Sequence, residues 1–212
     1  MCGRLYVKSN PGLTMYLHRM GLSGELPTLH NLAPSEFLPV IRYAGEAFAM
    51  DTMRWWLHPS WSPDPPNSQY SMFNARIETL ATSRAFKIPF QRQRAIIPVS
   101  GFVEWKAEGK NKIPYFVDCV DSPMLLAGIW DNWRDEVFSC AIVTQPASES
   151  FKNIHDRMPL SLSEIEAAEW LDPSAKPSDL LQSFEGKSLS LRCREVLPTI
   201  NNARKKLEVE FV

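Results

Sequence analysis

Closely spaced, short apolar runs separated by turns are the feature of this sequence that most constrains its fold. The runs span residues 95–99, 102–105, 115–117, 124–130 and 137–144, and they are rich in the β-branched and aromatic residues that favour strands. Seventeen prolines against nine glycines indicate many rigid turns and no long helices. Because the strands come in series without a strand–helix–strand rhythm, we predict an α+β fold with a largely antiparallel, barrel-like β core and short helices at its margins.

Helix signals lie on either side of these runs. Asn10 and Pro11 form an N-cap with proline at the first helical position, and Ser163 with Glu166 forms a capping box. The predicted helices span 11–20, 78–90, 163–170 and 178–186, with Pro89 closing the second. Further strands are predicted at 37–43, 48–57 and 189–196, a hairpin turn at 108–111, and an ordered but irregular loop at 59–67, which holds four prolines.

Composition limits the class of protein. A chain of 212 residues with 44% hydrophobic content can bury a sizeable core, so we expect one domain over residues 1–212. No apolar run reaches the roughly 18–20 residues of a membrane span, and the N-terminus lacks a signal-peptide pattern, which favours a cytoplasmic protein that does not contact a membrane. The four cysteines are widely spaced without a CxxC pair, so neither a disulfide framework nor a zinc site is expected. We predict no metal and no cofactor, and take a monomer as the default.

Charge is unevenly distributed along the chain. The net charge is −1, yet residues 76–112 carry eight Lys/Arg against three Asp/Glu. This segment is a candidate anion-binding surface within a nearly neutral protein. A basic, solvated face without a ligand is the alternative interpretation.

The second residue is a cysteine. Removal of the initiator Met1 would leave Cys2 with a free amine and a thiol on neighbouring carbons. The reference pKa of an α-amino group is about 7.7–8.0 and that of a thiol about 8.5, so both groups are usable nucleophiles near neutral pH. With an aldehyde, such an aminothiol forms an imine and then closes to a thiazolidine ring. The alternative is that Cys2 is an inert core residue.

Three other positions combine polar chemistry with apolar surroundings. Glu104 lies between apolar residues in a predicted core strand, where burial disfavours the charged form and suits a carboxyl to proton transfer. Asn74 offers a neutral amide that could orient an amine. His155 can act as a general acid or donate to a phosphate, with the fixed charge of Arg157 two residues away. Each has a structural alternative: an outward-facing Glu, a turn Asn, or a His that satisfies local hydrogen bonds.

Arginines and one tryptophan fit a nucleic-acid surface. Arg4, Arg76 and Arg84 suit phosphate oxygens, although Arg84 lies in a predicted helix where an arginine is often simply solvated. Trp61, on the proline-stiffened loop, suits stacking on a base, an interaction of about 1–3 kcal/mol per base.

Six fragments occur in an order that resembles the SRAP family, the SOS response-associated peptidases or abasic-site processing proteins. The resemblance covers about residues 2–171, and its fragments are Met1-Cys2-Gly3-Arg4, Asn31-Leu32-Ala33-Pro34, Asn74-Ala75-Arg76, Gly101-Phe102-Val103-Glu104-Trp105, Ala127-Gly128-Ile129-Trp130 and His155-Asp156-Arg157-Met158-Pro159.

The resemblance implies a protein that captures the ring-opened aldehyde of an abasic site in single-stranded DNA as a thiazolidine, and so shields the lesion. It also implies the roles of individual residues. Cys2 would be the nucleophile, Asn74 the orienting amide, Glu104 the acid/base group, and His155 the group that holds the lesion's phosphate or assists β-elimination. The DNA channel would be lined by Arg4, Pro34, Trp61, Arg76, Arg84, Thr144 and Arg157. The family further carries a proposed peptidase role, which we interpret as self-maturation.

The sequence departs from the family pattern at two motif positions and in its tail. Trp56 stands where the family commonly has glycine, and Ser100 replaces an aspartate often found before the GFxEW motif. The tail beyond residue 171 matches no known pattern and receives no function. Two other classes stay open: an N-terminal-nucleophile hydrolase of the class II glutamine amidotransferase type, and a non-covalent single-strand-binding module in which Cys2 is incidental.

Overall fold

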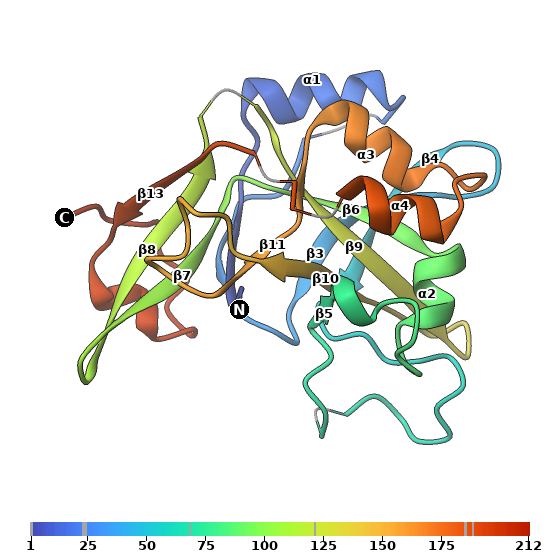
Figure 1. The fold of residues 1–212 in the computed structure, drawn as a ribbon, viewed down its shortest axis with the longest axis horizontal. Coiled ribbons are helices and arrows are strands. Elements are labelled where there is room, and N and C mark those ends of the chain that lie inside the picture. Colours follow the sequence, from blue (N-terminus) through green and yellow to red (C-terminus); the bar gives the residue numbers. More distant parts are fainter. Residues whose placement is uncertain (1, 23–24, 68, 121, 185, 188) are drawn as a thin grey trace.

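Two β-sheets build the molecule in the computed structural model, which describes residues 2–22, 25–67, 69–120, 122–184, 186–187 and 189–212. The smaller sheet is antiparallel, and its strands run in the order β13 (Leu191–Glu195), β8 (Asn111–Cys119), β7 (Gly101–Glu108), β1 (Arg4–Val7) and β2 (Leu29–Leu32). Figure 1 shows β1, β7 and β8 side by side next to the N-terminus.

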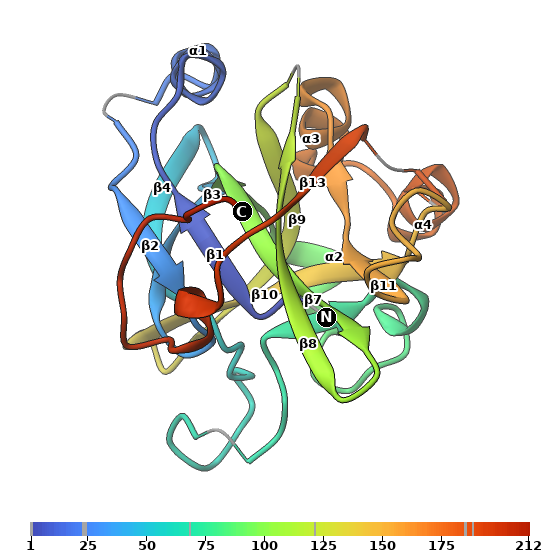
Figure 2. The same cartoon turned by 90° about the vertical axis from the view of Figure 1, so that its left-hand side faces the viewer.

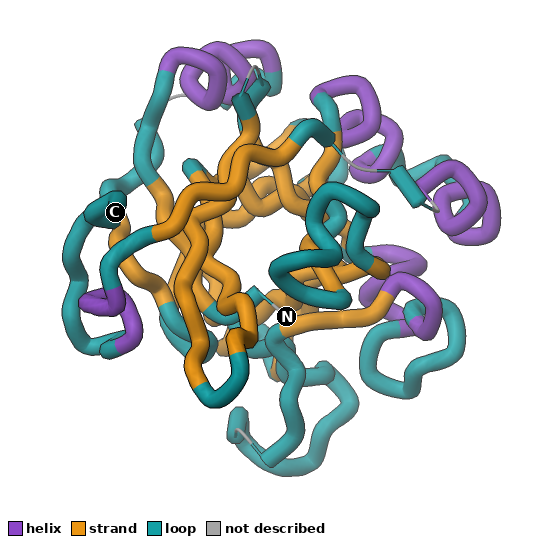
Figure 3. The backbone as a smooth tube through the Cα atoms, turned by 60° about the vertical axis from the view of Figure 1, so that its left-hand side comes forward, coloured by secondary structure: helices purple, strands orange, loops and turns teal. Residues whose placement is uncertain are grey.

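The larger sheet closes on itself. Its strands follow the order β10 (Val137–Pro146), β4 (Phe48–Arg54), β3 (Phe37–Tyr43), β6 (Arg94–Val99) and β9 (Met124–Trp133), and β9 pairs again with β10. Three short strands extend it: β5 (Asn74–Arg76) and β11 (Arg157–Pro159) on β10, and β12 (Ser161–Leu162) on β9. The tube view shows the strands as a ring with helices outside it (Figure 3). The predicted α+β class with an antiparallel-rich, barrel-like core is therefore confirmed.

Short helices lie around the sheets, and their ends follow local capping chemistry. The helices are α1 (Pro11–Arg19), α2 (Lys87–Arg92), α3 (Glu164–Leu171) and α4 (Pro177–Phe184), with 3-10 turns η1 (Ile77–Thr79) and η2 (Pro198–Asn201). Asn10 caps α1 by accepting the Leu13 N–H, and Ser163 and Glu166 form the predicted capping box of α3. Among the described residues, no helix is long and apolar enough to cross a membrane.

The helix predicted over 78–90 is wrong. That segment holds η1, a series of turns, and then α2, so Arg84 lies on a turn rather than on a helix. Pro89 does not close α2 but sits in its first turn, where the N–H groups have no partner within the helix and a missing N–H costs little.

The C-terminal tail packs on the outer face of the smaller sheet. Val196 and Ile200 join Tyr6, Val103 and Phe116 in a second, smaller apolar cluster. The strand predicted at 189–196 is present as β13, paired with β8, and Figure 2 shows η2 beside β1 and β2.

A buried asparagine anchors this tail. Asn31 has a φ of +49°, a left-handed conformation that asparagine tolerates better than most residues. Its side-chain amide nitrogen lies within 2.9–3.1 Å of three tail carbonyls, those of Ile200, Asn202 and Lys205. The Asn31 fragment that sequence reading assigned to a family motif therefore ties the tail to β2.

Gly101 permits the close packing of β7 on β8. A Cβ atom at this position would lie 2.3 Å from Cζ of Phe116 and 2.8 Å from the carbonyl oxygen of Val117. We expect Gly101→Ala to lower the free energy of unfolding by about 1–3 kcal/mol, the usual cost of overpacking, as measured by urea denaturation. Gly12→Ala is the control, because its nearest neighbour would be 3.4 Å away and alanine suits a helix. Equal stability of the two variants would contradict this role of Gly101.

Candidate active site

Cys2 lies two residues before β1 and is fully buried. Its thiol is 3.9 Å from the carbonyl oxygen of Arg4, to which it donates. Burial raises the pKa of the Cys2 thiol well above its ordinary value, and the negative charge of Glu104 raises it further. The thiol is therefore protonated at neutral pH and needs a base before it can attack.

Glu104 reaches Cys2 through strand pairing. Arg4 pairs with Val103 and Leu5 with Phe102, so Glu104 lies one residue beyond the last pair, beside the segment that carries Cys2. Side chains alternate along a strand, and Phe102, two residues from Glu104, belongs to the main core. Glu104 accordingly points inward and is only 4% exposed, and its carboxylate accepts the Trp105 N–H at 3.0 Å. The alternative of an outward-facing carboxylate is wrong.

Asn74 contacts Cys2 directly. It sits on β5, paired with Ile142 of β10, and its Nδ2 donates to the Cys2 carbonyl oxygen at 2.9 Å. Its Oδ1 is also buried and accepts no hydrogen bond within the part of the chain that the structure describes. Asn74 can therefore accept an N–H from an amine on the Cα of Cys2 while holding the adjoining carbonyl. The turn-residue alternative does not hold, because Asn74 is in a strand.

His155 lies on the loop between β10 and β11. This loop packs against β7, since the rings of Phe151 and Phe102 are 6.0 Å apart. Nδ1 of His155 lies 2.9 Å from the Arg157 backbone N–H and 2.7 Å from Oδ1 of Asp156. A neutral ring accepts the first contact with its proton on Nε2, whereas a protonated ring donates in the second. His155 is thus held locally in either state.

Arg157 has partners of its own. Its guanidinium forms a two-point ion pair with Glu78, and Nη2 also donates to the Thr144 carbonyl oxygen at 2.8 Å. The Arg157 side chain is 12% exposed, and Thr144 is fully buried. Arg76, which pairs with Thr144 across the β5–β10 ladder, is exposed instead. Of these predicted DNA contacts, Arg76 is the one whose side chain meets solvent freely.

The guanidinium of Arg84 stacks on the ring of Trp61. Cζ of Arg84 lies 4.3 Å from the ring centroid, and Trp61 is 47% exposed. Both residues line a cavity of about 270 Å³ beside Trp56, whose ring packs on Phe73 at 5.2 Å. Trp56, where the family commonly has glycine, therefore adds an aromatic ring to the cavity that Trp61 also lines.

The tail adds a residue that sequence reasoning missed. Asn201 accepts a hydrogen bond from the Trp105 indole Nε1 at 2.7 Å, and its carbonyl oxygen accepts one from Arg4 at 3.5 Å. Arg4 also donates to the Gly3 carbonyl oxygen at 2.7 Å and lies over the Trp105 ring. Asn201 thus contacts Trp105, which follows Glu104 directly, and Arg4, which lies two residues after Cys2. No local sequence pattern marks it, because the contact spans 96 residues.

The remaining predicted positions are peripheral. Pro34 is half-buried on the turn after β2, and Ser100 donates to the Tyr6 carbonyl oxygen at 2.9 Å, joining β7 to β1 where the family often has aspartate. Within the described ranges, no three His, Cys, Asp or Glu side chains gather in a way that could hold a metal ion.

The chain is similar to known proteins over most of its length. The family model "SOS response associated peptidase (SRAP)" matches residues 1–203, which extends the resemblance beyond residue 171 into the tail. The abasic site processing protein YoaM of Bacillus subtilis is 34% identical over 193 residues, covering 87% of this chain and 85% of that protein. YedK of Escherichia coli, also an abasic site processing protein, is 38% identical over 146 residues, covering 67% and 64%.

A crystal structure of a protein from Bacteroides thetaiotaomicron has the same fold, with a TM-score of 0.80 at 22% identity over 92% of each chain. Since the family model spans nearly all of the sequence and relatives exceed 30% identity, the chain belongs to the SOS response associated peptidase (SRAP) family.

Proposed function

We propose that this protein binds single-stranded DNA and, after removal of Met1, forms a covalent thiazolidine with abasic sites through Cys2. The crosslink would shield the lesion on damaged DNA in the cytoplasm. The names of the relatives support abasic-site processing. The observation that carries the proposal is the convergence on Cys2, where Asn74 binds its carbonyl oxygen and the charge of Glu104 acts on its thiol.

The order of bond formation follows from the state of the two nucleophiles. Because the thiol is protonated, the amine of Cys2 attacks the aldehyde carbon first. The Glu104 carboxylate then carries the two protons that nitrogen loses to the aldehyde oxygen, which leaves the carbinolamine as water and gives a neutral imine. Sulfur then adds to the imine carbon, and its proton passes through Glu104 to the nitrogen. One water leaves, and one C–N and one C–S bond form.

The neighbouring groups would bind the strand. Exposed Arg76 is suited to the phosphate beside the lesion, and the Trp61–Arg84 pair to a base further along. Arg4, Pro34, Thr144 and Arg157 would shape the channel between them, with Arg157 held by Glu78. His155 would assist a β-elimination at the lesion, and the same thiol and carboxylate would serve a self-maturing cleavage after Met1.

The crosslink is the primary test. Protein that begins at Cys2 is expected to give a denaturant-resistant adduct with an oligonucleotide containing an abasic aldehyde, at the summed masses less one water. Cys2→Ser and a chain that keeps Met1 should give none, whereas Cys193→Ser, a partly exposed cysteine, should react normally. Mass spectrometry and denaturing gels report the outcome. An adduct with Cys2→Ser, or with a tetrahydrofuran site that has no aldehyde, would exclude the proposal.

Proton transfer by Glu104 is tested by Glu104→Gln, which keeps the shape and removes the titrating group. We expect the crosslinking rate at saturating DNA to fall about 100-fold, at the lower end of general acid–base effects. Binding of tetrahydrofuran-containing DNA should change little. Glu108→Gln, on the exposed end of the same strand, is the matched control. If binding falls as far as the rate, Glu104 is a binding group instead.

Asn201 should help to position Glu104 through Trp105. The indole N–H of Trp105 binds Asn201, and the backbone N–H of Trp105 binds the Glu104 carboxylate. Asn201→Ala and Trp105→Phe are each expected to slow crosslinking about 2- to 12-fold, the range of one hydrogen bond. The double variant should be no slower than the slower single variant, and Asn201→Asp, which keeps the acceptor oxygen, should restore the rate. Additive losses measured at saturating DNA would mean that the two residues act separately.

A further inference from the structure

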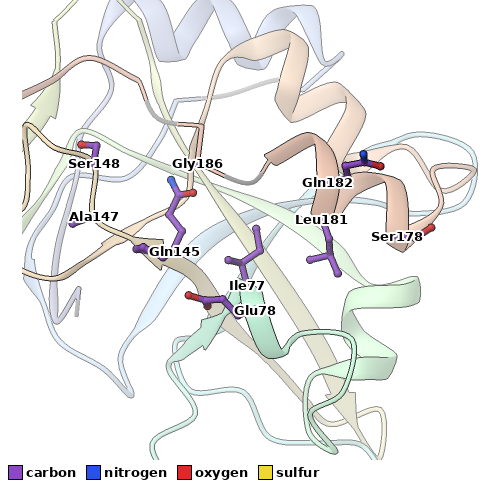
Figure 4. Close-up of a pocket in the computed structure, with 10 residues that line it drawn as sticks. Ile77, Glu78, Gln145, Ala147, Ser148, Ser178, Leu181, Gln182 and Gly186 are labelled. Atoms are coloured by element: carbon purple, nitrogen blue, oxygen red, sulfur yellow. The ribbon is translucent and has the colours of Figure 1, made fainter.

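A cavity of about 680 Å³ lies next to the candidate active site, between η1, the end of β10 and α4. Figure 4 shows its lining residues on these three elements, on the loop that follows β10 and at Gly186 after α4. Ile77, Pro146, Ala147 and Leu181 provide apolar walls. The volume falls within the roughly 300–1,000 Å³ of sites that enclose small organic groups.

One buried polar side chain lines this apolar space. Gln145 lines the cavity and is only 2% exposed. Its Nε2 donates to the Lys187 carbonyl oxygen at 2.5 Å, which assigns the orientation of the amide. Oε1 is buried and accepts no hydrogen bond from the described part of the chain. A buried oxygen without a donor is costly, so the arrangement fits a ligand that is mainly apolar and carries one N–H.

The lining of the cavity adjoins residues of the proposed DNA path in the sequence. Ile77 follows Asn74 by three residues, so the two Cα atoms are at most about 11 Å apart. Gln145 follows Thr144, which pairs with exposed Arg76. Glu78 lines the cavity as well, but its carboxylate is paired with Arg157, which lowers the repulsion toward a phosphate. A strand with its lesion at Asn74 and a phosphate at Arg76 would therefore have its adjacent nucleotide close to Ile77, which lines the cavity.

We propose that this cavity takes an unpaired nucleobase that flanks the abasic site. This inference rests on the proposed function. The two faces of a base are apolar enough to lie between Ile77 and Leu181, and every base carries an N–H donor on its pairing edge for Oε1 of Gln145. Recognition of this kind tolerates any sequence, because each base offers both features.

Binding to two oligonucleotides tests the proposal. One carries a single tetrahydrofuran site between normal nucleotides, and the other has the two neighbouring bases replaced by tetrahydrofuran as well. Wild-type protein should bind the first at least fivefold more tightly, the lower limit for stacking of one base. Leu181→Trp, which fills the cavity, should bind both with the weaker affinity. Leu181→Met, of similar volume, should behave as wild type.

Gln145→Met is a second variant, which removes the acceptor and keeps the side chain's length. It should lose part of the preference, and thermal unfolding checks that both variants fold. The proposal is overturned if wild type does not distinguish the oligonucleotides, if folded Leu181→Trp still does, or if the cavity takes free nucleotides equally well without a lesion strand. A separate experiment measures crosslinking of the wild-type protein to an abasic aldehyde that has no flanking bases. If no crosslink forms there, the proposed function is overturned, and not the proposal about the cavity.

Discussion

The antiparallel pairing of β1 with β7 is the constraint on which the candidate site depends. It brings together residues 2 and 104, which no local structure could join, and it sets which side of β7 faces Cys2. A shift of one residue in this register would turn Glu104 to the outer face and put Val103 or Trp105 beside the thiol. Gly101 and Ser100 hold the register at its other end. The glycine lets Phe116 approach the strand, and the serine binds the Tyr6 carbonyl oxygen.

Both faces of the β1–β7 pair are covered by other parts of the protein, and each covering has a different effect on the candidate site. The inner face packs on the main core, and the burial that results raises the pKa of the Cys2 thiol. The outer face lies beneath the tail, where Asn31 binds the tail carbonyls and Asn201 binds Trp105. The tail thus contributes contacts that hold Arg4 and the neighbour of Glu104, Trp105, in place. Its inclusion in the family match as far as residue 203 agrees with this structural role.

Features set by short-range chemistry were predictable. The caps of α1 and α3, the strand at 37–43 and the hairpin turn at 108–111 follow from neighbouring residues, and all are present. The helix predicted over 78–90 failed because Ala85 and Phe86 are buried through turns, and no signal in the neighbouring residues marks this. The sequence also could not predict which charged residues form ion pairs and which are exposed. Arg157 and Arg76 look alike in sequence, but the structure joins Arg157 to Glu78, 79 residues away, in an ion pair and leaves the Arg76 side chain exposed.

By itself, the sequence determined the strand-rich class, the caps of α1 and α3 and the set of candidate site residues, because these depend on residue type and on contacts within a few positions. The tertiary structure decided which of these groups meet. Asn74 binds Cys2 across 72 residues and Asn201 binds Trp105 across 96, contacts that depend on sheet register and on the path of the tail. The cavity lined by Ile77, Gln145 and Leu181 has the same origin, since its walls come from separate elements that only packing brings together.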